Sequence, residues 1–221
     1  MPDTTRIFLC RHAHPDNPQG VFYGHLPGFG LSAKGVRQAL GLGDHLSRYP
    51  IQRFYASPLQ RAQETASLAN SRLPRELEIE TRDALVEAAF GKYVQGVKQG
   101  RAPFVRPLFW VHMVRPGRLA IDETVAALAE RVGSVVLEAL QANRGHAAAL
   151  ISHADPIKAF WNVYLGQRDW RFHFLDLGKG GFLELVYEGD DLVAIHPHAA
   201  IEATTARPVA ASVTGTQGGA L

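Results

Sequence analysis

Three short segments with strand-like composition constrain the fold of this chain most strongly, because helical patterns separate them along the sequence. They are Ile7–Cys10, Ile51–Ala56 and Ala147–Ile151, and Leu77–Thr81 is a further short candidate. Apolar segments of this length without a helical period are typical of buried strands. Strands that alternate with helices predict an α/β fold. We therefore expect a three-layer α/β/α sandwich, with a mostly parallel sheet and helices on both faces.

Capping residues predict where the helices between these strands begin. Ser32 is expected to cap a helix that runs to about Tyr49. Ser57-Pro58-Leu59-Gln60 has the pattern of a capping box, with proline at the first helical position, and predicts a helix to about Asn70.

The second half of the chain continues the alternation. Asp122 is expected to cap a long helix, and Asp155-Pro156 is expected to open another helix that Gly166 ends. Phe182–Tyr187 and Leu192–His196 predict a final hairpin around Gly189-Asp190. The long helix has an apolar stripe of Val125, Leu128, Val132, Val135, Val136 and Ala139.

At 221 residues the chain suits one domain, which we place at residues 1–202. Residues 88–118 are rich in glycine, proline and aromatic side chains, and predict an irregular insertion with one short helix near Phe104–Met113. Residues 203–221 carry one charge and no aromatic side chain, which predicts a disordered tail.

Composition excludes several classes of function. The 23 basic and 21 acidic residues give a net charge of +2, so overall charge predicts no nucleic-acid partner and no membrane partner. No apolar run approaches the ~20 residues of a membrane helix. The single cysteine, Cys10, excludes an internal disulfide framework. The amino-terminal residues lack the pattern of a signal peptide, and we expect a cytoplasmic protein.

Reactive side chains follow three of the predicted strands. Arg11-His12 ends the first strand, Ser57 ends the second with Arg61 one turn into the next helix, and Ser152-His153 ends the fourth, Ala147–Ile151. In a parallel sheet these ends meet at one edge, where ligands bind. Two arginines, two histidines and two helix N-termini would form a positive pocket there. Because arginine forks match phosphate oxygens, the pattern predicts a phosphate site.

These segments resemble the motifs of the histidine phosphatase superfamily, which includes the phosphoglycerate mutases. Leu9-Cys10-Arg11-His12-Ala13 is similar to its arginine–histidine signature, and Ser57 to Ala66 is similar to its second-arginine motif. Ile151-Ser152-His153-Ala154 is similar to its second-histidine motif, and Glu87-Ala88-Ala89-Phe90-Gly91 to the segment with its acidic residue. The four motifs occur in order over roughly residues 6–196.

The resemblance implies a mechanism without a metal or other cofactor. His12 would attack phosphorus as a neutral imidazole and form a phosphohistidine. Arg11, Arg61 and His153 would stabilise the phosphoryl oxygens, and Glu87 would act as the proton donor. The expected substrate is a small phosphorylated metabolite. The resemblance also implies His14, Asn17 and Ala154 as candidate substrate contacts, although His14 replaces the glutamate or glutamine of many members.

Other functions stay open at this level. Mutases of the family carry a longer insertion before the second histidine and an ordered C-terminal lid, so hydrolysis is the first hypothesis and a mutase the alternative. A second alternative is a non-catalytic pseudophosphatase that binds a phosphorylated ligand or a partner protein. His12-x-His14 after a strand also resembles a metal pair. The loop with His25 is expected near the pocket, and Arg101, Arg106, Arg115 and Arg118 form a solvated face or bind an acidic substrate tail.

Overall fold

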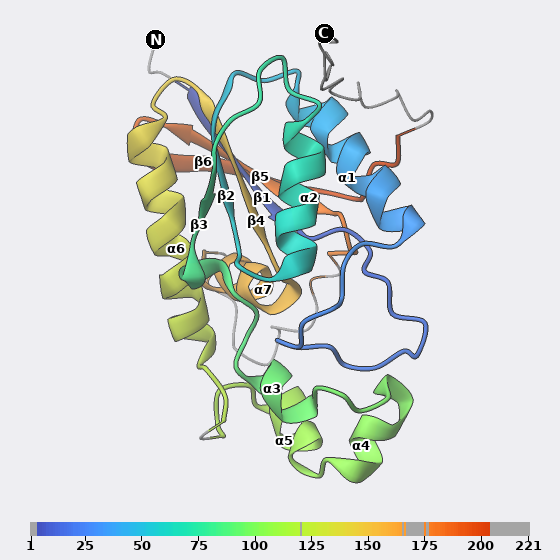
Figure 1. The fold of residues 1–221 in the computed structure, drawn as a ribbon. Helices are drawn as coiled ribbons and strands as arrows, with labels where there is room; N and C mark the ends of the chain where they lie inside the picture. Colours follow the sequence, from blue (N-terminus) through green and yellow to red (C-terminus); the bar gives the residue numbers. More distant parts are fainter. Residues whose placement is uncertain (1–3, 120, 165, 167–174, 176, 204–221) are drawn as a thin grey trace, which may run out of the picture.

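A six-stranded mixed sheet forms the centre of the molecule (Figure 1). The computed structural model describes residues 4–119, 121–164, 166, 175 and 177–203. The strand order is β3-β2-β4-β1-β5-β6. The first four strands in this order are parallel, and β5 and β6 continue the sheet antiparallel. The strands are β1 (Thr4–Arg11), β2 (Ile51–Ala56), β3 (Ile79–Thr81), β4 (Ala147–Ser152), β5 (Phe182–Glu188) and β6 (Asp191–His198).

Helices cover both faces of this sheet, as predicted. One face packs against α1 (Ala33–Leu46) and α2 (Gln60–Asn70), and the other packs against α6 (Val125–Ala142) and α7 (Ala154–Tyr164). Side chains of β1 alternate between the two cores: Ile7 and Leu9 face α6 and α7, and Phe8 and Cys10 face α1 and α2. Because both faces are buried, the central strands are apolar throughout. The α/β/α sandwich is therefore confirmed.

Most predicted elements are present, but two predicted helix caps are wrong. The α2 helix begins at Gln60 with Leu59 as its cap, and the Ser57 hydroxyl instead lies 2.7 Å from Nε2 of His153. The long helix α6 is capped by Thr124, whose hydroxyl accepts from the Ala127 amide. The Asp122 carboxylate instead accepts a hydrogen bond from the amide of Gly117.

A small helical lobe lies below the carboxyl ends of the parallel strands (Figure 1). It contains α3 (Phe90–Val94), η2 (Gln99–Arg101), α4 (Ala102–Val105) and α5 (Leu108–Val114), whereas η1 (Asp83–Leu85) packs against α6 and β4 above it. The single helix predicted over Phe104–Met113 is two helices, because Pro107 forces Arg106 out of the helical region, to φ −128° and ψ 84°.

The register of the sheet brings the motif-bearing strand ends together. Arg11 of β1 lies opposite Ser152 of β4, and Ala56 of β2 lies opposite Ile151. The residues that follow these strands therefore meet at one edge. Within the described residues no helix is long and apolar enough to cross a membrane. The predicted tail from residue 204 onward lies outside the described residues.

Candidate active site

Two histidines and an arginine form the buried floor of the site. His12 follows β1 and His153 follows β4, and their ring centroids lie 5.1 Å apart. Arg61, in the first turn of α2, brings its Nη2 to 3.2 Å from Nδ1 of His153. All three side chains are almost completely buried. The three strand-end motifs thus converge on one point.

His12 is held in a state that suits nucleophilic attack. Its Nδ1 lies 2.8 Å from the carbonyl oxygen of Ala13, so Nδ1 carries the proton and donates to that oxygen. The lone pair is therefore on Nε2. Burial lowers the pKa of His12 well below its usual value, and the nearby Arg61 and Arg11 lower it further. The imidazole is neutral at physiological pH.

His153 is oriented by two neighbours. Arg61 donates to Nδ1 of His153, so the proton of a neutral ring is on Nε2, which donates to the Ser57 hydroxyl at 2.7 Å. Burial lowers the pKa of His153 well below its usual value, with Arg61 as the next cause. Ser57, expected as a helix cap, thus fixes the second histidine.

The guanidinium groups of Arg11 and Arg61 are each fixed by a backbone carbonyl, and each has an N–H donor that is not used within the described part of the chain. Arg11 donates from Nη1 to the carbonyl of Leu177 at 2.6 Å, and Arg61 donates from Nη2 to the carbonyl of Gly24 at 2.9 Å. The Nε atoms of both arginines are buried and have no hydrogen-bond partner among the described residues. Unpaired buried donors are costly, so two of them beside a neutral imidazole point to an anionic ligand.

Tyr23 covers this floor. Its ring lies 4.6 Å from the Arg61 guanidinium carbon, and its centroid is 6.2 Å from that of His12. Burial raises the pKa of Tyr23, against the opposing effect of the Arg61 and Arg11 charges, so its hydroxyl stays protonated. The loop before α1 therefore contributes to the site through Tyr23 and through the Gly24 carbonyl.

Gly24 provides a first prediction, on stability. It adopts φ +44°, and a Cβ there would collide with the backbone carbonyl of Gly91. Gly24→Ala should therefore lower the free energy of unfolding by about 1–3 kcal/mol, measured by urea titration. Gly20→Ala is the matched control, because Gly20 has φ +62° but open space around its Cβ position. Equal losses in both variants would show that backbone strain alone, and not the contact with Gly91, determines the effect.

Glu87 lies at the rim, on a segment clamped from both sides. Its own carboxylate accepts from the Ala88 amide at 3.0 Å. Arg131 of α6 donates to the carbonyl of Val86 at 2.7 Å and pairs with Glu123. The other oxygen of Glu123 accepts from the Ala89 amide at 3.0 Å. Arg131 and Glu123 therefore fix the backbone on either side of Glu87.

The protonation of Glu87 is shifted toward neutrality. Desolvation, aided by the negative charge of nearby Asp155, raises the pKa of Glu87 to about 7 against the opposing effects of the Ala88 amide, Arg61 and Arg11. A carboxyl group with a pKa near the working pH is suited to both giving and taking a proton.

A cavity of about 290 Å³ opens beside the floor. Arg11, Tyr23 and Glu87 line it, whereas His12, Arg61 and His153 are buried and do not line it; Tyr23, whose ring lies next to both His12 and Arg61, separates them from it. The wall formed by the helical lobe and the loop before α1 is largely apolar. Its apolar lining residues are Phe22, Phe90, Val94, Phe109 and Met113. The cavity therefore joins a polar floor to an apolar wall.

The amino-acid sequence matches a known protein family over most of its length. The family model described as histidine phosphatase superfamily (branch 1) matches residues 7–197. The chain belongs to the histidine phosphatase superfamily. It is 34% identical over 196 residues to Uncharacterized protein MT0547 of Mycobacterium tuberculosis, a match that covers 88% of this chain and 96% of that protein.

Relatives with assigned activities include phosphatases and mutases. Phosphoserine phosphatase 1 of Hydrogenobacter thermophilus is 28% identical over 76% of this chain and 81% of its own length. A 2,3-bisphosphoglycerate-dependent phosphoglycerate mutase of Thermoplasma acidophilum is 29% identical, covering 71% and 74%. Among solved structures, YhfR of Bacillus stearothermophilus superimposes with a TM-score of 0.74 at 19% identity, covering 90% and 96%, which shows the shared fold.

Within this histidine phosphatase superfamily member, the remaining predicted substrate contacts divide into two groups. Ala154 lines the cavity. His14 instead places Nδ1 3.0 Å from the Ser32 hydroxyl, and Asn17 bonds to both backbone groups of Val21, and neither residue is among those that line the cavity. His25, which was expected near the pocket, contacts the backbone of the Glu87 segment, with its Nε2 2.9 Å from the carbonyl oxygen of Glu87.

Several residues of the site were not singled out by sequence motifs. Tyr23, Asp155, Lys158 and Lys179 all line the cavity. The only signal for any of them is that Tyr23 precedes the Gly24-His25 loop expected near the pocket. No group of three histidine, cysteine or carboxylate side chains in the described part of the chain could hold a metal ion, so His12 and His14 find no third ligand there.

Proposed function

We propose that this protein is a phosphomonoester hydrolase that acts through a phosphohistidine on His12. The observation that carries the proposal is the neutral His12 imidazole, with its lone pair on Nε2, in a site with two buried guanidinium Nε donors that have no hydrogen-bond partner in the part of the chain that the structure describes. Cys10, the one cysteine, is fully buried, and burial raises the pKa of its thiol far above the usual value, so it does not compete as nucleophile.

The reaction proceeds in two steps. In the first, Nε2 of His12 attacks phosphorus and the ester P–O bond breaks, while protonated Glu87 gives its proton to the leaving oxygen. In the second, water attacks phosphorus, Glu87 takes a proton from that water, and the P–N bond breaks. Arg11 and Arg61 stabilise the negative charge of the phosphoryl oxygens in both steps, and His153 joins them when its Nε2–H donates to a phosphoryl oxygen in place of the Ser57 hydroxyl.

The cavity supports a small phosphorylated metabolite as substrate. Its volume of about 290 Å³ matches a small leaving group, and Phe22, Phe90 and Phe109 favour one with an apolar body. Lys158 and Lys179 also line it, and they suit a substrate that carries a negative charge besides the phosphate.

A panel of phosphate esters, assayed for release of inorganic phosphate, tests the proposal. We expect metal-independent release that vanadate inhibits. A protein that binds phosphate esters tightly but releases no phosphate from any of them would instead be a non-catalytic binding protein.

The test between hydrolase and mutase uses 3-phosphoglycerate with 2,3-bisphosphoglycerate. We expect phosphate release to exceed formation of 2-phosphoglycerate, because a mutase must exclude water from its phosphohistidine. Isomerisation faster than hydrolysis would identify a mutase, the activity of the Thermoplasma relative.

Substitution of Arg61 should weaken turnover of every ester. Arg61→Ala removes a positioned charge from the buried floor, where one such contact contributes about 10²-fold in rate, so kcat/KM should fall by at least about that factor for all substrates. Arg37→Ala, on the exposed surface of α1, is the control and should leave kcat/KM unchanged. A loss confined to one substrate would place Arg61 on the leaving-group side.

A further inference from the structure

The helical lobe exposes an unusual amount of apolar surface. Of the thirteen large apolar side chains that are exposed among the described residues, eight lie between Phe104 and Ile121. Phe104 is 85% exposed, Val114 62% and Trp110 57%. Single exposed apolar side chains are ordinary, but a contiguous group of this kind marks an interaction surface.

The same lobe carries only positive charge. No aspartate or glutamate occurs between Glu87 and Asp122, whereas this interval contains Lys92, Lys98, Arg101, Arg106, Arg115 and Arg118. All of these except Arg106 are exposed. The ion pairs found among the described residues involve none of the six. We call the exposed surface of residues 98–118 the basic-apolar tip.

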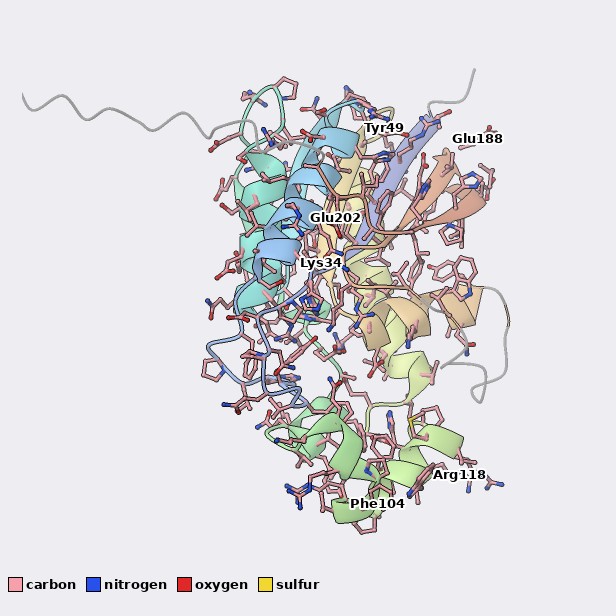
Figure 2. The ribbon with its side chains drawn as sticks, turned by 90° about the vertical axis from the view of Figure 1, so that its right-hand side faces the viewer. Lys34, Tyr49, Phe104, Arg118, Glu188 and Glu202 are labelled. Atoms are coloured by element: carbon pink, nitrogen blue, oxygen red, sulfur yellow. The ribbon has the colours of Figure 1, made fainter. Side chains whose placement is uncertain are left out.

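This tip projects from the molecule next to the candidate active site. In Figure 2, Phe104 and Arg118 both lie on the helical lobe, at the end of the molecule opposite Tyr49. The α5 helix presents two faces: Phe109 and His112 line the cavity, and Trp110 and Val114 are exposed. A surface that binds the tip would therefore lie close to the cavity.

We propose that the basic-apolar tip docks on the surface of an anionic lipid bilayer. Exposed aromatic and aliphatic side chains bury into the headgroup region, and arginine and lysine side chains attract anionic lipids. Trp110 combines an apolar ring with a polar edge, the combination that favours the bilayer interface. The net charge of +2 for the whole chain conceals this local excess, which is why overall charge predicted no membrane partner.

A second copy of the chain fits the tip less well. In a two-fold symmetric dimer the same patch meets itself, so the exposed cations of one tip would face those of the other. The lobe has no acidic side chain between Glu87 and Asp122 to compensate this repulsion. An anionic bilayer supplies the missing negative charge together with an apolar layer, and so satisfies both features of the surface.

Co-sedimentation with vesicles tests the proposal on the full-length protein. We expect binding to vesicles of equimolar phosphatidylcholine and phosphatidylglycerol, little binding to phosphatidylcholine alone, and weaker binding as salt increases. The double variants Arg101→Glu/Arg115→Glu and Phe104→Ser/Val114→Ser should each reduce the partition coefficient by more than about tenfold. The tryptophan fluorescence of the protein should shift to the blue when the vesicles are added, and Trp110→Phe should remove this shift.

The control variant is Leu137→Ser/Val193→Ser, which removes two side chains that are each 51% exposed but lie on α6 and β6. Its binding should equal that of the native protein. Turnover of a soluble ester and the melting temperature should stay unchanged in both tip variants, because none of the four residues lines the cavity. Absence of binding to the anionic vesicles, or equal binding by all variants, would refute the proposal. Self-association that only the tip variants abolish would refute it in favour of a dimer.

Discussion

His12→Ala should abolish phosphate release from every ester and should leave no acid-labile phosphate on the protein. The reason lies in the site itself, because the two other candidate nucleophiles among its described residues are not available: Cys10 is buried and its thiol has a strongly raised pKa, and Nε2 of His153 is bonded to Ser57. Arginine contacts alone stabilise charge but cannot form the covalent intermediate. The measurement is single-turnover labelling with a ³²P-ester, followed by acid and alkaline treatment.

His146→Ala is the matched control, because His146 is an exposed histidine that is distant in the fold from the cavity. It should label and turn over like the native protein. Label that persists on a histidine in the His12→Ala variant would assign the nucleophile to another residue, with His153 the next to be substituted.

The convergence of the motifs could be predicted from the sequence because it depends on strand order alone. Parallel strands place their carboxyl ends at one edge, so Arg11-His12 and Ser152-His153 had to meet once β1 and β4 were neighbours. The apolar stripe of α6 was equally predictable, since 3.6-residue periodicity is a local property.

The prediction that Ser57 caps α2 is wrong because a local sequence pattern contains no information about partners that are distant in the sequence. The Ser57 hydroxyl accepts from the amide of Leu59, which precedes α2, and its shorter bond is to His153, 96 positions away. The same reason hides Tyr23 and Lys179 from motif analysis. Their positions follow from hydrogen bonds that hold the backbone of their loops: the Gly180 amide donates to the His12 carbonyl, and the Arg61 side chain donates to the Gly24 carbonyl. Neither contact has a sequence signature.

The prediction for Glu87 concerns the leaving group. Glu87→Gln keeps the shape of the side chain but removes its proton, so hydrolysis of an alkyl phosphate should slow by about 10²–10⁴-fold. Hydrolysis of para-nitrophenyl phosphate should slow much less, because its leaving group departs without protonation. Asp83→Asn is the control: Asp83 is exposed and absent from the cavity lining, so both substrates should react as with the native protein. Equal losses on both esters in Glu87→Gln would indicate structural damage, and Asp83 would then be reconsidered as the acid.

The pH dependence adds a second, independent readout for the same residue. Because the pKa of Glu87 is raised to about 7, the carboxyl is protonated and active as an acid below that pH and is lost as an acid above it. In the native protein, turnover of the alkyl ester should therefore fall as pH rises through about 7. His12 does not contribute to this decrease in turnover, because burial holds its pKa well below the usual value and the imidazole is already neutral around pH 7. In Glu87→Gln, turnover of the alkyl ester should not decrease as pH rises through about 7. Persistence of the decrease in that variant would mean that another group, such as the neighbouring Asp155, supplies the proton.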